Sequence, residues 1–551
     1  MNLALAETKS EIDFILKKTS EKLIWLPINL ETLIYVDEKK LKYLNPSDFF
    51  DKKNHEEGIL EQENFIKNLY FQELKHESLE NRYKSIMRKY FNSIFLIITF
   101  YEKIRKKNDI KKIFLSGWND HSFSSIKNNN FVSLICSEIF KNEKTEIITL
   151  SKITFKKFNS SYKYFLKEKN IINKPFILFS NLEYNFKRFI PILKKKKIKI
   201  VYFEFGKLNI LKKGLYYLFG IHPITVKRKE VKIKNENYKS EINYKYLNYD
   251  LSTLLNIRSK QAFQEIEDIR NKFNAIEIFF DNNKPKIIIT NLVRGVNGYI
   301  LELAKKYKIK SIAISHGTLA KSYNKYDELF QDLISEELIS KYSTYFACQS
   351  KISFDFCKNK KLSNKVLKTG NLIFSQSKEK RKKFILYAVT MRHFSNNHYY
   401  GIETFFEFYK NLEIFSQISK EKKINFLIKL HPNINYLKSD LEKRFSFLKF
   451  TTEPINKSLS KAYLTISFSS TAIEDSLYSN VPVILYDPNK RYMHCKSQSQ
   501  TTKKNYAIYY SSDRESLLEA INTIKTSKEI NFSEYTYQGH FNENIYKLIS
   551  D

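Results

Sequence analysis

The sequence predicts an α/β protein with two Rossmann-like, doubly wound domains that face each other across a cleft, preceded by a helix-rich N-terminal extension. Its 551 residues are more than one hydrophobic core usually serves, so two or more domains are expected. From Lys111 onward, short apolar segments alternate with charged helical stretches, which is typical of parallel sheets with crossover helices. A second series of the same kind begins near Ser343, so we expect the domain boundary near residue 338.

The expected elements follow in chain order. The extension, residues 1–105, should contain helices near 61–74 and 79–106 and one strand at Leu33–Val36. Strands of the first domain, which ends at 338, are expected at Lys112–Leu115, Pro175–Ser180, Ile198–Phe203, Lys286–Thr290 and Ser311–Ser315. Strands of the second domain, 339–551, are expected at Ser343–Ala347, Val366–Lys368, Lys383–Val389, Asn425–Leu430, Tyr463–Ser467 and Val481–Tyr486. The segment 227–249 is charged and aromatic without a clear period, so we interpret it as an insertion or loop.

The chain is strongly basic, with 94 Lys and Arg against 59 Asp and Glu and a net charge of +35. Such a surface attracts a polyanion, an anionic membrane or a phosphorylated substrate. Compositional drift toward lysine is the alternative explanation. A nucleic-acid-binding protein would need a concentrated basic stripe and a recognition motif. The lysines are spread through both halves, so no nucleic-acid partner is expected.

Cysteine and N-terminal patterns bear on cofactors and location. The four cysteines form no Cys-x-x-Cys pair, and no metal-ligand cluster or P-loop is present, so neither a metal nor a cofactor is expected. The N-terminus lacks the layout of a signal peptide. The longest apolar run, around Phe91 to Tyr101, is too short to span a bilayer. We expect a cytoplasmic protein, with peripheral attachment to the inner face of the cell membrane as the membrane alternative.

Four polar signatures each follow an apolar strand. They are Ser315–Thr318, Tyr387–Arg392, Lys429–Pro432 and Ser467–Glu474. Ligands of open parallel sheets bind at the carboxyl ends of the strands, so these four segments are the candidate site.

The last signature resembles a phosphate site. Ser469, Ser470 and Thr471 lie between a strand and a helix, where hydroxyls and backbone N–H groups suit a phosphate or diphosphate. Glu474, one turn further, could accept hydrogen bonds from ribose hydroxyls. Simple helix capping is the alternative explanation, and for this signature taken alone it is the favoured one.

The second and third signatures add two phosphate ligands. His431 follows a strand, and Pro432 turns the chain out of the sheet, so the imidazole can donate to a phosphate oxygen. Arg392 can hold a phosphate through two hydrogen bonds. A structural histidine and an exposed surface arginine are the alternatives.

The first signature offers a general base. His316 follows a strand of the first half and could take a proton from an acceptor hydroxyl. Asp120 and His121 follow the strand Lys112–Leu115 and are further acceptor-side candidates. A histidine that only ends a strand, and an ordinary turn, are the alternatives.

Together the four signatures resemble the CDP-glycerol glycerophosphotransferase family, of the teichoic-acid polymerase type, and less closely bacterial capsule-polysaccharide transferases. The similarity covers roughly residues 311–492. The resemblance implies a GT-B arrangement, with the acceptor bound by the N-terminal domain and the nucleotide by the C-terminal domain. It implies that His316 is the base and that Arg392, His431, Ser469 and Ser470 bind the donor phosphates. Val389 and Met391 stand where the family has Pro and Trp.

The expected function is therefore a transferase of surface-polysaccharide synthesis. It would move a glycerol phosphate or sugar from a nucleotide-activated donor, with a cytidine nucleotide favoured, to a hydroxyl of a polysaccharide or lipid-linked acceptor. A CMP-sugar transferase of the Kdo or sialic-acid type is the first alternative. A non-enzymatic basic nucleic-acid-binding protein is the second. A nucleotide-sugar epimerase is less favoured, because the match to such enzymes is confined to the general fold.

Overall fold

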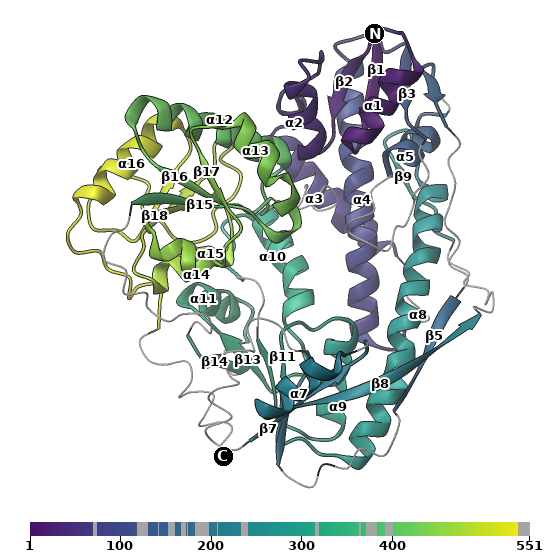
Figure 1. Ribbon diagram of the computed structural model, residues 1–551, viewed down its shortest axis with the longest axis vertical. Coiled ribbons are helices and arrows are strands. Elements are labelled where there is room, and N and C mark those ends of the chain that lie inside the picture. Colours follow the sequence, from purple (N-terminus) through teal and green to yellow (C-terminus); the bar gives the residue numbers. More distant parts are fainter. Residues whose placement is uncertain are drawn as a thin grey trace.

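A computed structural model of the chain describes residues 1–69, 74–117, 131–141, 143–151, 160–166, 172, 175–181, 198–206, 208–232, 241–314, 319–362, 365–370, 383–391 and 400–537. Within these ranges the chain forms three larger sheets and one two-stranded ribbon. Figure 1 shows the sheets at three corners of the molecule, with two long helices running between the upper and lower ones on the right.

The first sheet has four parallel strands in the order β2-β1-β3-β4. Its strands are β1 (Asn2–Ala6), β2 (Ile24–Pro27), β3 (Lys112–Leu115) and β4 (Glu146–Thr149). Its helices are α1 (Lys9–Lys18), α2 (Leu30–Glu38) and α5 (Phe131–Ile139). The N-terminal extension thus contributes strands as well as helices, and this order is the flavodoxin-like one.

The strand expected at Leu33–Val36 is wrong, because these residues lie in α2. Asn29 caps this helix by accepting a hydrogen bond from the Thr32 N–H. Leu30, Leu33 and Ile34 have the spacing of one helical face and enter the main core together. The run Leu33–Val36 is apolar enough for a buried strand, but the Asn29 cap starts a helix before it.

Two long helices connect the first sheet with the second. They are α4 (Glu77–Arg105) and α8 (Ser252–Asn282), and α3 (Lys52–Lys67) precedes them. The helix expected at 79–106 is confirmed as α4. The two long helices lie side by side (Figure 1), and the Tyr83 hydroxyl is 2.6 Å from the Ser259 hydroxyl between them.

The second sheet has eight strands in the order β14-β13-β12-β11-β6-β7-β8-β5. They are β5 (Ser160–Leu166), β6 (Phe176–Phe179), β7 (Lys199–Glu204), β8 (Ile221–Lys232), β11 (Ile287–Thr290), β12 (Ser311–Ile314), β13 (Tyr345–Cys348) and β14 (Val366–Lys368). Only β5 is antiparallel to its neighbour. Its helices are α7 (Ile210–Leu218), α9 (Gly295–Lys306), α10 (Lys325–Leu338) and α11 (Lys351–Asn359).

Part of the segment interpreted as an insertion is regular structure. Strand β8 extends to Lys232, and its second half pairs with β5. The ribbon β9 (Lys245–Tyr246) and β10 (Tyr249–Asp250) follows. The charged second half of β8 lacks an apolar pattern because it pairs beyond the reach of β7, which contacts only its first half.

The third sheet has six parallel strands in the order β17-β16-β15-β18-β19-β20. They are β15 (Phe384–Ala388), β16 (Phe426–Lys429), β17 (Lys449–Thr451), β18 (Ala462–Ser467), β19 (Val483–Tyr486) and β20 (Ile508–Ser511). Its helices are α12 (Phe405–Lys422), the 3₁₀ helix η4 (Pro432–Leu437), α13 (Lys438–Arg444), α14 (Ile455–Ser460), α15 (Thr471–Tyr478) and α16 (Arg514–Thr526). Numbered along the chain this order is 3-2-1-4-5-6, that of the Rossmann fold.

Helices cover both faces of this sheet. Ile385 and Tyr387 pack with residues of α12 and α16, whereas Leu386 between them packs with Leu459 of α14. The sheet is therefore doubly wound, and the predicted fold class, α/β with two Rossmann-like doubly wound parts, is confirmed.

The assignment of two strands to the second series is wrong. Strands β13 and β14 extend the eight-stranded sheet from β12, so the division between the two large sheets lies between Lys368 and Phe384. The alternation of strand and helix is the same on both sides of residue 338, and only the pairing partner distinguishes them. The limits of independently folding domains stay a prediction.

No helix in the described part of the chain is long and apolar enough to cross a membrane. The described residues also contain no group of three or more His, Cys, Asp or Glu side chains that could hold a metal ion.

Candidate functional site

The candidate site lies at the carboxyl edge of the six-stranded sheet, between the ends of β15 and β18. The strand order reverses there, and open α/β sheets bind ligands at such a switch point. The Ser467 hydroxyl donates to the Ala388 carbonyl over 3.1 Å and ties the two strand ends together. The two loops that follow are thus held at a fixed separation.

Ser470 begins the helix on the β18 side of the crevice. Its hydroxyl oxygen accepts the Ala472 N–H at 3.1 Å and caps α15, as the capping alternative expects. A hydroxyl that accepts one bond still has its own hydrogen to donate, so the cap leaves it able to bind an anion. Thr471 is exposed on the first turn. The amino end of this helix therefore presents a positive dipole and two hydroxyls.

Ser469 is paired with a histidine that sequence reasoning missed. Its hydroxyl lies 3.1 Å from Nδ1 of His494, and Nε2 of that ring has no hydrogen-bond partner within the described ranges. His494 is 2% exposed, and burial lowers its pKa to about 4. The ring is therefore neutral near pH 7 and fixes the orientation of the Ser469 hydroxyl.

His431 lies at the end of β16 and begins η4. Its Nδ1 accepts the Asn433 N–H at 3.2 Å, so the neutral ring carries its proton on Nε2. In that tautomer the Nε2–H group is a hydrogen-bond donor. Strands β16 and β18 flank β15, and a sheet spaces neighbouring strands by about 4.8 Å, so the ends of β16 and β18 are about 10 Å apart.

A buried carboxylate, also missed from the sequence, fixes the loop after β15. Glu403 accepts hydrogen bonds from the Tyr387 hydroxyl, the Asn411 amide at 3.1 Å, and the Thr390 backbone and hydroxyl at 3.1 and 2.8 Å. Burial raises its pKa. These hydrogen bonds tie Thr390, in the loop after β15, to the segment that begins α12.

Glu474 contacts the eight-stranded sheet. Its Oε1 accepts hydrogen bonds from the hydroxyls of Ser350 and Ser353, the latter at 3.2 Å. Ser350 caps α11 of the eight-stranded sheet, so the 5%-exposed carboxylate joins the two large sheets. This contact joins α15 to α11, and the expected contact of Glu474 with a ribose stays a prediction.

A second buried network holds the loop after β19. The Arg491 side chain is fully buried and forms an ion pair with Glu407, with 2.6 Å between Nη2 and Oε2. Its guanidinium lies 4.4 Å from the centre of the Phe468 ring. Asp487 accepts the backbone N–H groups of Arg491 and Tyr492 at 2.7 and 2.8 Å. Burial alone would raise the pKa of Glu407, but Arg491 holds it well below its usual range.

This network also attaches α3 to the site. His55 is 1% exposed, and its Nε2 lies 3.6 Å from Glu407 Oε1. Burial, followed by the Arg491 charge, lowers the His55 pKa to about 4. The neutral ring therefore packs beside the ion pair without adding a charge.

Four predicted residues, His316, Arg392, Asp120 and His121, lie outside the described residues. The chain resumes at Leu319 after the first of them. The Ala320 N–H donates to the Gln331 side chain at 3.1 Å, and the Gln331 amide donates to the Tyr492 hydroxyl at 2.9 Å. The segment after 318 thus meets the six-stranded sheet at the loop that carries His494.

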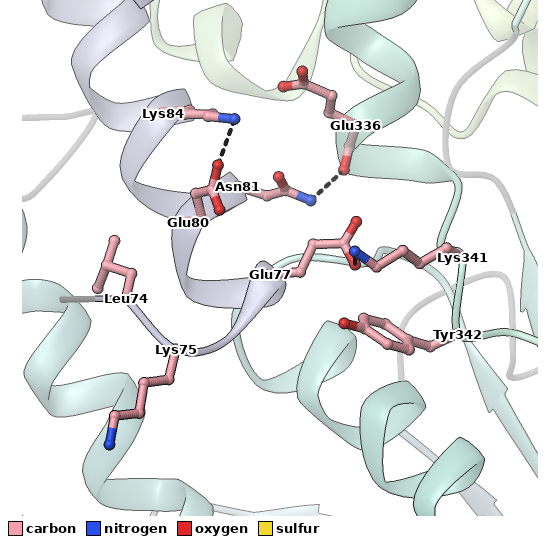
Figure 2. A pocket seen from close by; sticks show the side chains of 9 residues that line it. All are labelled: Leu74, Lys75, Glu77, Glu80, Asn81, Lys84, Glu336, Lys341 and Tyr342. Carbon is pink, nitrogen blue, oxygen red and sulfur yellow. Dashed lines mark hydrogen bonds and ion pairs between the residues drawn. The ribbon is translucent and has the colours of Figure 1, made fainter. Parts of the chain in front are cut away.

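A polar pocket among the described residues lies elsewhere. Figure 2 shows a polar cavity of about 390 Å³ between the start of α4 and the end of α10, with side chains of both helices directed toward it. Lys341 pairs with Glu77 at 3.3 Å, and Lys84 pairs with Glu80 at 2.6 Å. Lys341 and Tyr342 precede β13, so the pocket borders the amino edge of the eight-stranded sheet and not a carboxyl edge.

Comparisons with known proteins give fold-level likeness only. No protein-family model matches the chain, and no curated protein matches it. The UDP-GlcNAc 2-epimerase from Neisseria meningitidis, solved bound to UDP-GlcNAc, is similar over 68% of this chain and 99% of its own, with 16% identity and a TM-score of 0.41. The UDP-GlcNAc 2-epimerase from Methanocaldococcus jannaschii covers the same shares at 13% identity and a TM-score of 0.38. An Anabaena protein in complex with UDP and glucose matches 69% of this chain and 100% of its own, at 10% identity and a TM-score of 0.37. These values assign no reaction to the chain.

Proposed function

We propose that the protein is a transferase that moves a glycerol phosphate or sugar from a nucleotide-activated donor to a hydroxyl of a polysaccharide or lipid-linked acceptor. The observation that supports it is the placement of Ser469, Ser470 and His431 at the ends of the two strands that flank β15, around the switch point of a Rossmann-order sheet.

These groups suit the phosphates of a nucleotide. The Ser470 hydroxyl and the amino end of α15 lie on one side of β15, and His431 lies on the other, about 10 Å away by strand spacing. A nucleotide diphosphate spans such a distance. When the nucleotide leaves, negative charge grows on its phosphate, and donors that are already oriented stabilise it without rearrangement.

Ser469 and His494 act together in this proposal. The neutral imidazole orients the Ser469 hydroxyl by the 3.1 Å contact. A hydroxyl held by a buried ring has fewer orientations to lose when it binds a phosphate oxygen. His494 is therefore a positioning residue and makes no direct contact with the donor.

The acceptor side rests on the resemblance. His316 would take the proton of the acceptor hydroxyl. If His316 is not the base, Asp120 or His121 would have that role. In glycerol phosphate transfer that hydroxyl attacks phosphorus, a phosphodiester forms and the nucleoside monophosphate leaves. In the CMP-sugar alternative it attacks the anomeric carbon. The two reactions differ in whether a new phosphodiester forms, and comparison of the ³¹P spectra of acceptor and product shows this directly.

The test of the donor site is calorimetric titration of CDP, CMP, UDP and GDP into the intact protein and into Ser470→Ala and His431→Ala. Each variant loses a hydrogen bond to a charged group, so affinity for the preferred nucleotide should fall about 10- to 150-fold. Nucleoside without phosphate should bind all forms alike.

Asp513→Ala is the matched control. It removes the cap of α16 at the outer strand β20 of the same sheet. Its stability should fall by about 1 kcal/mol, as for any lost cap, with nucleotide affinity unchanged. Wild-type affinity in both Ser470→Ala and His431→Ala would place the donor elsewhere.

A further inference from the structure

Helix α7 is a crossover helix that leaves its apolar side chains in solvent. Ile210, Leu211 and Leu218 are 85%, 77% and 71% exposed, and Leu215 and Phe219 are also exposed. No residue of this helix is buried. A helix that connects parallel strands ordinarily buries its apolar stripe against the sheet, whereas Ile210, Leu211 and Leu218 add little to the core of the described residues.

The helix is attached to the sheet by a small part of its surface. Tyr216 packs against the core and approaches Tyr202 of β7 with 6.1 Å between ring centres. The Ile200 N–H donates to the Gly220 carbonyl at 3.0 Å and fixes the end of the helix beside the start of β7. Figure 1 shows α7 at the lower end of the molecule, near β7 and β8.

Positive charge surrounds these apolar side chains. Lys212 and Lys213 lie within the helix. The Lys212 ammonium is 5.6 Å from the centre of the Tyr216 ring, and the Lys213 ammonium is 6.0 Å from the centre of the Tyr217 ring. Lys199 lies beside the carboxyl end of α7 through the Ile200 contact. In the sequence, four further lysines, 194–197, directly precede this strand.

We propose that α7 docks the protein on an anionic lipid bilayer. The apolar side chains would enter the boundary between headgroups and acyl chains, and the flanking lysines would contact the acidic headgroups. This inference does not depend on the donor site, because it concerns a helix of the other large sheet.

A second copy of the chain fits this surface less well. Symmetric pairing would bring Lys212 and Lys213 against their counterparts, and like charges oppose association. The face of a nine-residue helix is also small beside the roughly 800 Å² that each partner of a stable interface buries.

The experiment is sedimentation of the full chain with vesicles of pure phosphatidylcholine and of phosphatidylcholine containing 30% phosphatidylglycerol. At low salt the protein should pellet at least tenfold more strongly with the acidic vesicles. Leu211→Ser/Leu218→Ser should lose at least tenfold in binding through the apolar part. Lys212→Glu/Lys213→Glu should lose a similar factor, since each Lys near an anionic surface contributes about fivefold.

Phe447→Ser is the matched control, because Phe447 is 51% exposed, also lies beside a lysine and belongs to the other large sheet. It should bind like wild type. Unfolding temperature and nucleotide titration confirm that each variant is folded, independently of any catalytic assay. Leu218→Trp adds a direct readout, because its fluorescence should shift to the blue with acidic vesicles only.

Equal pelleting of wild type and Leu211→Ser/Leu218→Ser would overturn the proposal. A second result would also overturn it: the wild type is a dimer in sedimentation equilibrium without lipid, the double variant is a monomer, and neither protein binds vesicles. In that case a second copy covers α7.

Discussion

His494 couples the fold to pH through its burial beside Ser469. Its pKa is about 4 in the folded protein, against an ordinary value of about 6.5. Between these values the unfolded chain binds a proton that the folded chain does not. The stabilisation is therefore complete above pH 6.5 and is lost as the pH falls toward 4.

Replacing this histidine should make the protein less sensitive to acid. In His494→Gln the free energy of unfolding should fall less steeply between pH 7.5 and pH 5, by about 2 kcal/mol at pH 5. Urea unfolding at the two pH values measures this. His55 is also buried with a lowered pKa, so the free energy of unfolding of the variant should still fall somewhat as the pH decreases. Parallel pH profiles for wild type and variant would show that His494 is protonated alike in both states.

Glu403 stabilises the loop after β15 by accepting four hydrogen bonds. Glu403→Ala should lower the free energy of unfolding by about 3 kcal/mol, because it leaves buried donors without acceptors. Denaturant titration measures the loss. Glu421→Ala, near the end of the following helix, removes an exposed ion pair with Arg514 and should cost less than about 1 kcal/mol. Similar losses in the two variants would mean that water replaces the Glu403 carboxylate.

Local pattern predicted the strand-end residues but not the side chains that hold them. Ser470 and His431 follow apolar strands directly, so their place at the carboxyl edge could be predicted. His494 and Glu403 act on partners 25 and 13 residues away. Nothing in the loops that carry them marks those partners, because the pairing follows from how the loops fold back over the sheet.

At the scale of elements, helix α9 packs against the start of α4 through Gly298. A Cβ on this glycine would lie 2.0 Å from the Val293 carbonyl oxygen and 2.6 Å from Ser78 Cβ. Both distances are too short for atoms in contact. The Ser78 contact means that a side chain here pushes α9 away from α4, and the Val293 contact means that the turn before α9 must shift as well.

Two glycine substitutions should therefore have opposite signs. Gly298→Ala should lower the free energy of unfolding by about 1–3 kcal/mol through overpacking. Gly214→Ala, in α7, meets no atom within 4 Å and should raise it by up to about 1 kcal/mol through helix propensity. Denaturant unfolding of both variants measures the pair. A neutral Gly298→Ala would show that α9 can move away from α4 at little cost.

Element types could be predicted from periodicity, whereas sheet membership could not. Strand β13 has the same apolar run as β15, yet it pairs with β12 and belongs to the other sheet. The strands β1 and β2 were missed because each is short and followed at once by a helix. Which strands pair depends on contacts across the chain, and no local pattern records them.

At the scale of the whole molecule, two of the contacts between the six-stranded sheet and the rest of the described chain differ in burial. The hydrogen bond from the Ser350 hydroxyl to the Glu474 carboxylate is buried. Arg444 with Asp37, 2.5 Å from Arg444 Nε to Asp37 Oδ2, joins α13 to α2 and is partly exposed.

Loss of the buried contact between Glu474 and Ser350 should loosen α11 and α15 selectively. Glu474→Ala should increase amide hydrogen exchange about tenfold or more in α11 and α15, since two buried hydroxyls lose their acceptor. Exchange in α4 and α8 should not change. Asp37→Ala, which removes the partly exposed ion pair with Arg444, should change amide hydrogen exchange by a few-fold at most. Uniformly faster exchange along the Glu474→Ala chain would indicate global destabilisation instead.

The continuous helix α4 links two of the three sheets over a long distance. With 29 residues it is about 43 Å long, and it contacts α8 along the way. We therefore expect that a closure of the candidate site, where a ligand drives one, rotates the six-stranded sheet against the other two sheets together. Such a rotation would have to keep or break the contacts of Glu474 with Ser350 and of Arg444 with Asp37, because both cross from the six-stranded sheet to the rest of the chain.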